Sequence, residues 1–156
     1  MARSRWKKSY NGDTLRSGFE VRGAKFLDEK KIEYGYETVK LKYLVPESSH
    51  VYTPDFNLEN GIVLEYKGRF TPEDRKKMML IKEQYPELDL RLVFMVDNTL
   101  TKNGKTKYSD WCIKKGYTYH VARDGSLPDD WLAPKKGEAV AKKKERKARK
   151  AKEATE

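Results

Sequence analysis

A predicted β-hairpin in the middle of the chain constrains the fold more than any other sequence feature. Two strand-like runs, 51–58 and 62–67, flank Glu59-Asn60-Gly61. Asn-Gly is a strong signal for a tight turn between strands, because both residue types tolerate a left-handed backbone. A turn at this point places Leu58 opposite Ile62. The register of the whole hairpin follows, since each residue then faces the one equally far from the turn on the other strand.

Helix-start signals lie on both sides of the hairpin. Ser17-Gly18-Phe19-Glu20 fits a capping box and predicts a helix that runs to about Lys31. Thr71-Pro72-Glu73-Asp74 combines a capping residue, a proline in the first turn and two acids, so it predicts a second helix that ends near Tyr85-Pro86. A shorter helix is expected over 108–115, followed by Gly116.

Further strands complete the expected fold. Apolar residues alternate over 39–45 until Pro46, and 47–49 is interpreted as a connection. Leu88–Val96 is the most apolar run of the chain, which is typical of a central strand covered on both faces. A short strand is expected over 117–122. The order helix, strand, hairpin, helix, strand, helix, strand predicts an α/β domain with a mixed sheet flanked by helices.

Charge divides the chain into a neutral domain and two basic ends. The net charge is +10; residues 1–16 contribute +4, residues 135–156 contribute +6, and 17–134 are balanced. We expect a basic N-terminal arm that is mobile unless bound, a domain over 17–134, and a C-terminal tail that is disordered when free. Basic arms of this kind are typical of proteins that bind a polyanion. The alternative is that the ends serve only solubility.

Several classes of protein are excluded by the composition. Cys112 is the only cysteine, so an internal disulfide and a zinc finger are excluded, and its place in a predicted helix favours a buried small hydrophobe. No apolar run reaches the roughly 20 residues that span a bilayer. The N-terminus lacks the apolar segment of a signal peptide. We expect a soluble protein inside the cell, with no membrane partner.

The predicted hairpin register brings three charged side chains together. Asp55 lies opposite Glu65, and Glu65 and Lys67 share a face because they are two residues apart on one strand. Two adjacent carboxylates repel each other, and a divalent cation such as Mg²⁺ relieves the repulsion. Lys67 would orient or deprotonate an attacking water, or neutralise charge on a phosphate. The alternative is a solvated strand face with an incidental ion pair.

These residues resemble a known motif. Pro54-Asp55 followed by Glu65-Tyr66-Lys67 is similar to the PD-(D/E)xK motif of restriction-endonuclease-like nucleases. The resemblance is closer to the phage endonuclease I family of Holliday-junction resolvases, and it covers roughly residues 16–134. The similar stretches are Arg16-Ser17-Gly18-Phe19-Glu20, Tyr52-Thr53-Pro54-Asp55-Phe56, Asn60-Gly61-Ile62, Glu65-Tyr66-Lys67-Gly68, and Asp74-Arg75-Lys76-Lys77 through Pro86-Glu87-Leu88-Asp89.

The resemblance implies a catalytic set of Glu20, Asp55, Glu65 and Lys67. The three acids would hold Mg²⁺, with Mn²⁺ able to replace it. The capping box alone favours a structural role for Glu20, and only the resemblance makes it a third acid of the metal site. The resemblance also implies an intertwined homodimer that nicks two strands of a four-way DNA junction in the cytoplasm of the host cell. Residues 45–49 are the candidate linker for a domain swap.

Basic residues near the predicted site are candidates for DNA binding. Arg75, Lys76 and Lys77 open the second helix and would contact phosphates, or would form a solvated helical face. His50 would contact the scissile phosphate or a water, or is a plain surface histidine. Arg16 is the basic residue next to the first helix. No recognition helix, zinc finger or aromatic RNA motif is present in the sequence, which favours recognition of DNA shape and backbone.

Two other functions remain open from the sequence. One is a sequence-specific or non-specific duplex endonuclease on the same fold; the extra recognition elements of a sequence-specific enzyme are too large for this chain. The other is a non-catalytic DNA-binding protein that uses only its basic ends, in which case the arrangement of acids and lysine on the hairpin is accidental.

Overall fold

The protein is built around one mixed five-stranded sheet. The computed structural model describes residues 8–10, 13–45 and 47–135. The strand order is β3–β6–β7–β8–β9; β3, β6 and β7 are antiparallel neighbours, whereas β7, β8 and β9 run parallel. The bounds are Tyr34–Tyr36 for β3, Phe56–Leu58 for β6, Val63–Lys67 for β7, Leu90–Phe94 for β8 and Tyr119–Val121 for β9. The predicted α/β fold with a mixed sheet is confirmed.

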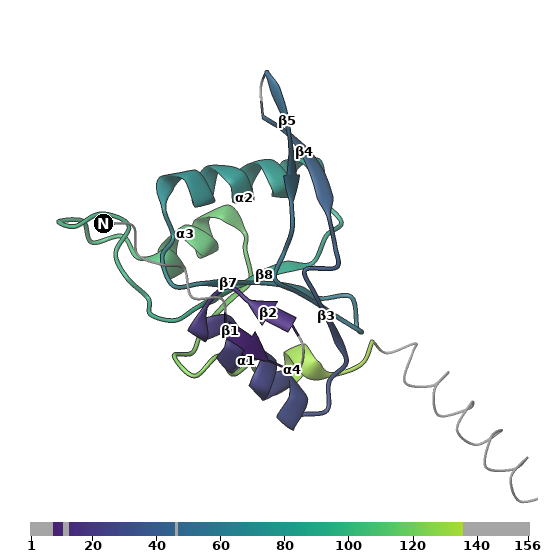
Figure 1. Cartoon of the computed structure of the whole chain (residues 1–156). Helices are drawn as coiled ribbons and strands as arrows, with labels where there is room; N and C mark the ends of the chain where they lie inside the picture. The colour runs from purple at the N-terminus through teal and green to yellow at the C-terminus, as the bar shows by residue number, and fades with distance from the viewer. Residues whose placement is uncertain (1–7, 11–12, 46, 136–156) are drawn as a thin grey trace, which may run out of the picture.

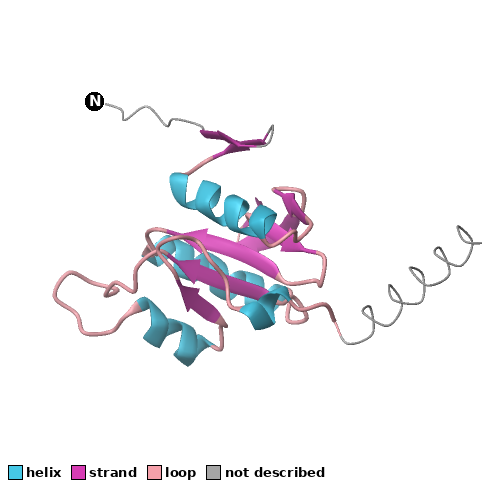
Figure 2. Ribbon diagram, turned by 90° about the horizontal axis from the view of Figure 1, so that it is seen from below, coloured by secondary structure: helices cyan, strands magenta, loops and turns pink. Residues whose placement is uncertain are grey.

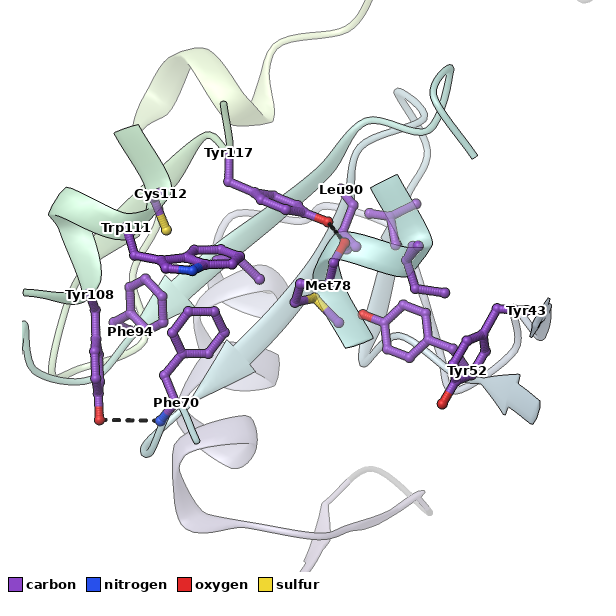
Figure 3. Packing of buried hydrophobic residues seen from close by; sticks show 13 residues of the cluster. Tyr43, Tyr52, Phe70, Met78, Leu90, Phe94, Tyr108, Trp111, Cys112 and Tyr117 are labelled. Atoms are coloured by element: carbon purple, nitrogen blue, oxygen red, sulfur yellow. Dashed lines mark hydrogen bonds between the residues drawn. The ribbon is translucent and has the colours of Figure 1, made fainter. Parts of the chain in front are cut away.

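Helices cover both faces of this sheet (Figures 1 and 2). Helices α1 (Gly18–Glu29) and α4 (Asp129–Leu132) lie on one face, and α2 (Pro72–Gln84) and α3 (Tyr108–Lys115) lie on the other. Successive side chains of a strand point to opposite faces. Leu64 of β7 therefore packs in the α1 cluster, whereas Val63 packs with Met78 of α2. Figure 3 shows the cluster between the sheet, α2 and α3.

The predicted helix ends agree closely with the structure. Ser17 caps α1, its Oγ accepting a hydrogen bond from the backbone N–H of Glu20 at 3.1 Å; the helix ends at Glu29, two residues before the predicted end. Thr71 and Asp74 form the capping box of α2. Gly116 ends α3 in the left-handed conformation, with φ of 73°, which glycine adopts without steric cost.

The predicted hairpin register is confirmed. Phe56 pairs with Leu64, so Asp55, the residue just before β6, comes level with Glu65. Gly61 occupies the turn with φ of 88°. The buried side chain of Asn60 donates hydrogen bonds to the backbone carbonyls of Trp131 and Ala133, which fastens α4 to the turn. Asn60 therefore has a tertiary role besides its turn signal.

The predicted strand 51–58 is wrong as a single element. β5 (Ser48–Tyr52) pairs with β4 (Leu41–Val45) in a separate two-stranded sheet that projects from the body of the protein (Figure 1). The predicted connection 47–49 is accordingly wrong for Ser48 and Ser49, which belong to β5. Pro54 interrupts the run before β6, because proline has no backbone N–H to give to a ladder.

The described residues within the expected mobile arm form two strands. β1 (Lys8–Tyr10) and β2 (Asp13–Leu15) form a hairpin that contacts α1, and Leu15 is only 1% exposed (Figure 2). Regular secondary structure is thus present before Ser17. These strands were missed because they are short and polar, and contact with α1 supplies the burial that their sequence does not signal. Residues 1–7 and 136–156, which include most of the predicted tail, lie outside the described residues.

Strand β3 and helix α4 are also absent from the sequence prediction. Both elements are short, and both are held by contacts distant in the sequence: β3 pairs with β6, and Trp131 of α4 is buried against the α1 side of the sheet. Within the described residues, no helix is long and apolar enough to cross a membrane.

Candidate active site

The three charged residues of the hairpin meet where β6 and β7 run side by side. Glu65 is 6% exposed, and its Oε1 forms an ion pair with Nζ of Lys67 at 3.2 Å. Its Oε2 accepts a hydrogen bond from the hydroxyl of Tyr52 at 2.7 Å. Oδ2 of Asp55 accepts from the backbone N–H of Tyr66 at 2.8 Å, which holds this carboxylate against β7. The predicted grouping of Asp55, Glu65 and Lys67 is therefore present.

A second group of acids adjoins Asp55. Carboxylate oxygens of Glu20, Glu37 and Asp55 lie within 4.8 Å of one another. Glu20 is buried; its Oε1 accepts from the Ser17 hydroxyl and its Oε2 accepts from the Tyr36 hydroxyl at 2.5 Å. The cap and the acid cluster were treated as competing roles for Glu20. The structure makes them compatible, because Ser17 caps the helix with its own hydroxyl while the Glu20 carboxylate lies beside Asp55.

Burial and mutual repulsion govern the electrostatics of these acids. Burial raises the pKa of Asp55 well above its usual value, and the nearby Glu65 and Glu20 carboxylates raise it further. Burial also raises the pKa of Glu65, although Lys67 and the hydrogen bond from Tyr52 oppose the shift. A divalent cation would stabilise the charged form of both groups. The donors are hard carboxylate oxygens, which suit Mg²⁺, so the residues present fit this ion.

Lys67 is held between two carboxylates. Its Nζ lies 3.1 Å from Oδ1 of Asp74 as well as 3.2 Å from Glu65. Burial alone would lower the pKa of Lys67, but Glu65 and Asp74 outweigh burial and the pKa is raised. Lys67 is therefore a charged ammonium at neutral pH. A charged ammonium can donate hydrogen bonds and offset negative charge, whereas it cannot accept a proton from water.

The chain matches known proteins along most of its length. The model of the family described as Phage endonuclease I matches residues 1–152. The chain belongs to this family. Over 109 residues it is 48% identical to Endodeoxyribonuclease 1 of Enterobacteria phage T3, covering 69% of this chain and 72% of the relative. Over 124 residues it is 45% identical to Endonuclease I of Escherichia phage T7, covering 78% of this chain and 81% of the relative.

The family membership agrees with the motif found in the hairpin. The resemblance stated from Pro54-Asp55 and Glu65-Tyr66-Lys67 is confirmed at the level of the family, and the match extends beyond the expected range of 16–134. Four side chains that contact the predicted set were missed as site residues: Tyr36, Tyr52, Glu37 and Asp74. Asp74 had a detectable signal as the acid of the α2 capping box. Glu37 had none, since an acid in a loop is not distinctive.

The candidate DNA-binding residues do not form one group around the acids. Lys77 lies 5.8 Å from the centre of the Tyr52 ring, on the Glu65 side of the site, and Lys76 is exposed. Nη1 of Arg75 donates to the carbonyl of Phe70 at 2.6 Å, and Arg16 forms an ion pair with Glu37 at 2.7 Å. His50 is exposed on β5, where its Nε2 lies 2.7 Å from the Ser48 hydroxyl. No contact in the described part of the chain brings His50 to the acids.

Cys112 behaves as expected for a structural residue. Its side chain is fully buried in the cluster between the sheet, α2 and α3, and burial raises the pKa of its thiol to about 12. The thiolate, which is the reactive form of cysteine, is therefore disfavoured at neutral pH.

We expect Asp55→Asn to stabilise the metal-free protein at neutral pH. The pKa of Asp55 is raised in the folded state, so the free energy of unfolding falls as the pH rises from 3.8, the usual pKa, to the folded-state pKa. The free energy of unfolding of the wild-type protein should recover as the pH falls toward 3.8, the usual pKa of an aspartate. The difference in this free energy between the wild type and Asp55→Asn should therefore become smaller. Urea unfolding in EDTA across this range measures both effects. A variant less stable than wild type at neutral pH would contradict the account.

We expect Asp74→Asn to lower the turnover rate by roughly tenfold or more, as loss of a supporting partner commonly does, with little change in KM. Asp74 holds Lys67 through Oδ1 and caps α2 through Oδ2. Thr71→Ala is the matched control, because it removes the cap but leaves the contact between Asp74 and Lys67. It should cost about 1 kcal/mol of stability without a comparable loss of rate. Equal losses of turnover rate in both variants would mean that Asp74 acts only by capping α2 and not by its contact with Lys67.

Proposed function

We propose that this chain is a magnesium-dependent DNA endonuclease that resolves four-way (Holliday) junctions and other branched DNA by paired nicks inside the host cell. The observation that carries the proposal is the arrangement of Asp55, Glu65 and Lys67 on one hairpin, where Glu65 is buried and Glu20 lies beside Asp55. The names of the relatives from phages T3 and T7, an endodeoxyribonuclease and an endonuclease, support the choice of DNA as substrate.

The acids and the lysine divide the chemistry between them. Asp55 and Glu65 would hold Mg²⁺, with Glu20 as a third oxygen donor; Mn²⁺ suits the same donors. When bound, the ion lowers the pKa of a water and offsets the charge that grows on the phosphodiester. Lys67, kept charged by Glu65 and Asp74, donates hydrogen bonds toward the phosphate oxygens. Tyr52 orients Glu65 by its hydrogen bond.

Homodimer formation with a domain swap is part of the proposal, and the β4–β5 hairpin supports it. Glu47, in the connection between these strands, has φ of 85°, a left-handed conformation that is strained for a residue with a Cβ atom. Opening the connection into one continuous strand would relieve this strain. Leu44 and Val51 on the same hairpin are 65% and 58% exposed. A partner strand would cover them, and residues 1–44 would cross to the partner's body.

Two active sites in one symmetric dimer suit a branched substrate, because resolution of a junction needs a cut in each of two strands. The duplex endonuclease of the same fold and the non-catalytic DNA-binding protein are the competing functions. Titration of Mg²⁺ into a cleavage assay with linear duplex and four-way junction distinguishes the three. We expect metal-dependent cutting of the junction in preference to the duplex. Equal cutting of both would favour the duplex enzyme, and binding without cutting at any Mg²⁺ or Mn²⁺ concentration would favour the non-catalytic protein.

A further inference from the structure

A hollow of about 370 Å³ lies between the loop 97–107 and the start of α2. We call it the loop–helix hollow. Its floor includes Phe70 and Tyr108, which lie side by side in Figure 3, where the backbone N–H of Phe70 donates to the Tyr108 hydroxyl at 3.2 Å. Its polar lining consists of Arg69, Thr71, Asn98, Thr99, Thr101 and Lys102. Most side chains that line this hollow are thus cationic or neutral hydrogen-bonding groups.

Two cations of the hollow have no counter-charge. Arg69 and Lys102 are exposed, and in the described part of the chain neither makes a hydrogen bond or an ion pair. Arg16 and Arg75, by contrast, are held by Glu37 and by the Phe70 carbonyl. Two unpaired cations beside one hollow, in a domain with no net charge, favour an anionic ligand.

The loop that forms one wall is held in place at its base. Asp97 accepts hydrogen bonds from the backbone N–H of Ser109 at 2.9 Å and from its hydroxyl at 2.6 Å. The backbone N–H of Tyr108 donates to the carbonyl of Asn98 at 2.9 Å. The only acid of the loop is thereby bonded to α3, which leaves Lys102, Lys105 and Lys107 as its charged side chains. The hollow is preformed, so a ligand need not order the base of the loop.

The hollow lies next to the candidate active site along the chain. Arg69 is two residues from Lys67, so their Cα atoms are at most about 7 Å apart. A side chain added at Gly68, between them, would meet no atom within 4 Å, so the backbone there borders open space. A strand of nucleic acid at Lys67 would therefore find open space beside Gly68 on the way to Arg69.

We propose that the loop–helix hollow binds a backbone phosphate of the cleaved strand, one or two nucleotides from the scissile phosphate, with Arg69 and Lys102 as its cations. This inference rests on the proposed function. It adds the direction in which the cleaved strand leaves the active site, over Gly68 toward the loop 97–107. The contact is to the backbone, so it is independent of base sequence.

The test compares Arg69→Ala/Lys102→Ala with Lys30→Ala/Lys31→Ala, which removes the same charge at the far end of α1. Junction binding is measured in EDTA over a range of salt concentrations, with strands checked for integrity on denaturing gels. Each lost phosphate contact lowers the slope of log K against log salt by about one unit. We expect the slope of the first variant to fall by about one to two units and its affinity to fall roughly tenfold. The control should keep the wild-type slope.

Neutral methylphosphonates then locate the phosphate. Each substrate carries one methylphosphonate on the cleaved strand. It replaces one of the two phosphates on the 5′ side of the scissile phosphate or one of the two on its 3′ side, which gives four positions. At one of these positions the wild-type protein should lose affinity, while Arg69→Ala/Lys102→Ala should lose nothing further, because the contact is already absent. Additive losses at all four positions, or an unchanged salt slope in the variant, would overturn the inference. Failure of wild-type protein to bind the junction at all would instead reject the proposed function.

Discussion

Glu65→Gln and Lys67→Ala should each reduce DNA cleavage in Mg²⁺ by on the order of 10³-fold, since each removes charge placed where the reaction develops it. Glu65 is buried, bonds both Tyr52 and Lys67, and would be one of two central metal donors. Lys67 is the charged ammonium at the site. Binding to the junction should change little, because most binding energy comes from phosphate contacts spread over a larger surface.

Single-turnover cleavage of a four-way junction and a binding titration in EDTA measure these effects separately. Glu73→Gln and Lys114→Ala are matched controls, because both side chains are exposed on the described surface and lie outside the acid cluster. Both controls should cut at the wild-type rate. Near-normal cutting by Glu65→Gln would remove the basis of the proposed active site, since Glu20 is the only other buried acid in the described residues and it lies in the same site.

A mixed dimer with Glu20→Ala in one subunit and Glu65→Ala in the other should nick one strand of a junction. Glu20 precedes the β4–β5 hairpin and Glu65 follows it. In the single chain, Glu20 lies beside the Asp55 carboxylate. A swap at this hairpin would keep this contact, but the two residues would then come from different subunits. One active site then contains both substitutions and the other contains neither. The mutant homodimers should have almost no activity, whereas the mixed dimer should make one nick per junction.

Two conditions make the mixed-dimer result interpretable. Both mutant homodimers must be inactive, and the mixed dimer must be shown to bind junction DNA. If each site is built within one chain, as the contacts of the single chain also allow, both sites carry a lesion and no strand is cut. A purified, binding-competent mixed dimer that cuts nothing would therefore reject the swapped arrangement, while leaving the assignment of an endonuclease in place.

Local signals predicted much of the architecture because their cause is local. The Asn60-Gly61 turn set the register that brings Asp55 level with Glu65, and capping residues marked the starts of α1 and α2 and the end of α3. The prediction of a single strand over 51–58 was wrong, and the reason is present in the sequence. Pro54 interrupts the ladder, and the residues before it pair with β4 instead of β7.

The sequence by itself determined the hairpin, the order of the main helices and strands, and the three charged residues that it brings to one place, since strand pairing across a short turn depends on neighbouring residues alone. Only the tertiary structure decided which further groups complete the site. Glu37 reaches Asp55 because β3 pairs with β6, and Asp74 reaches Lys67 because α2 packs on the sheet. These contacts depend on burial of distant segments against one another, and no local pattern encodes that burial.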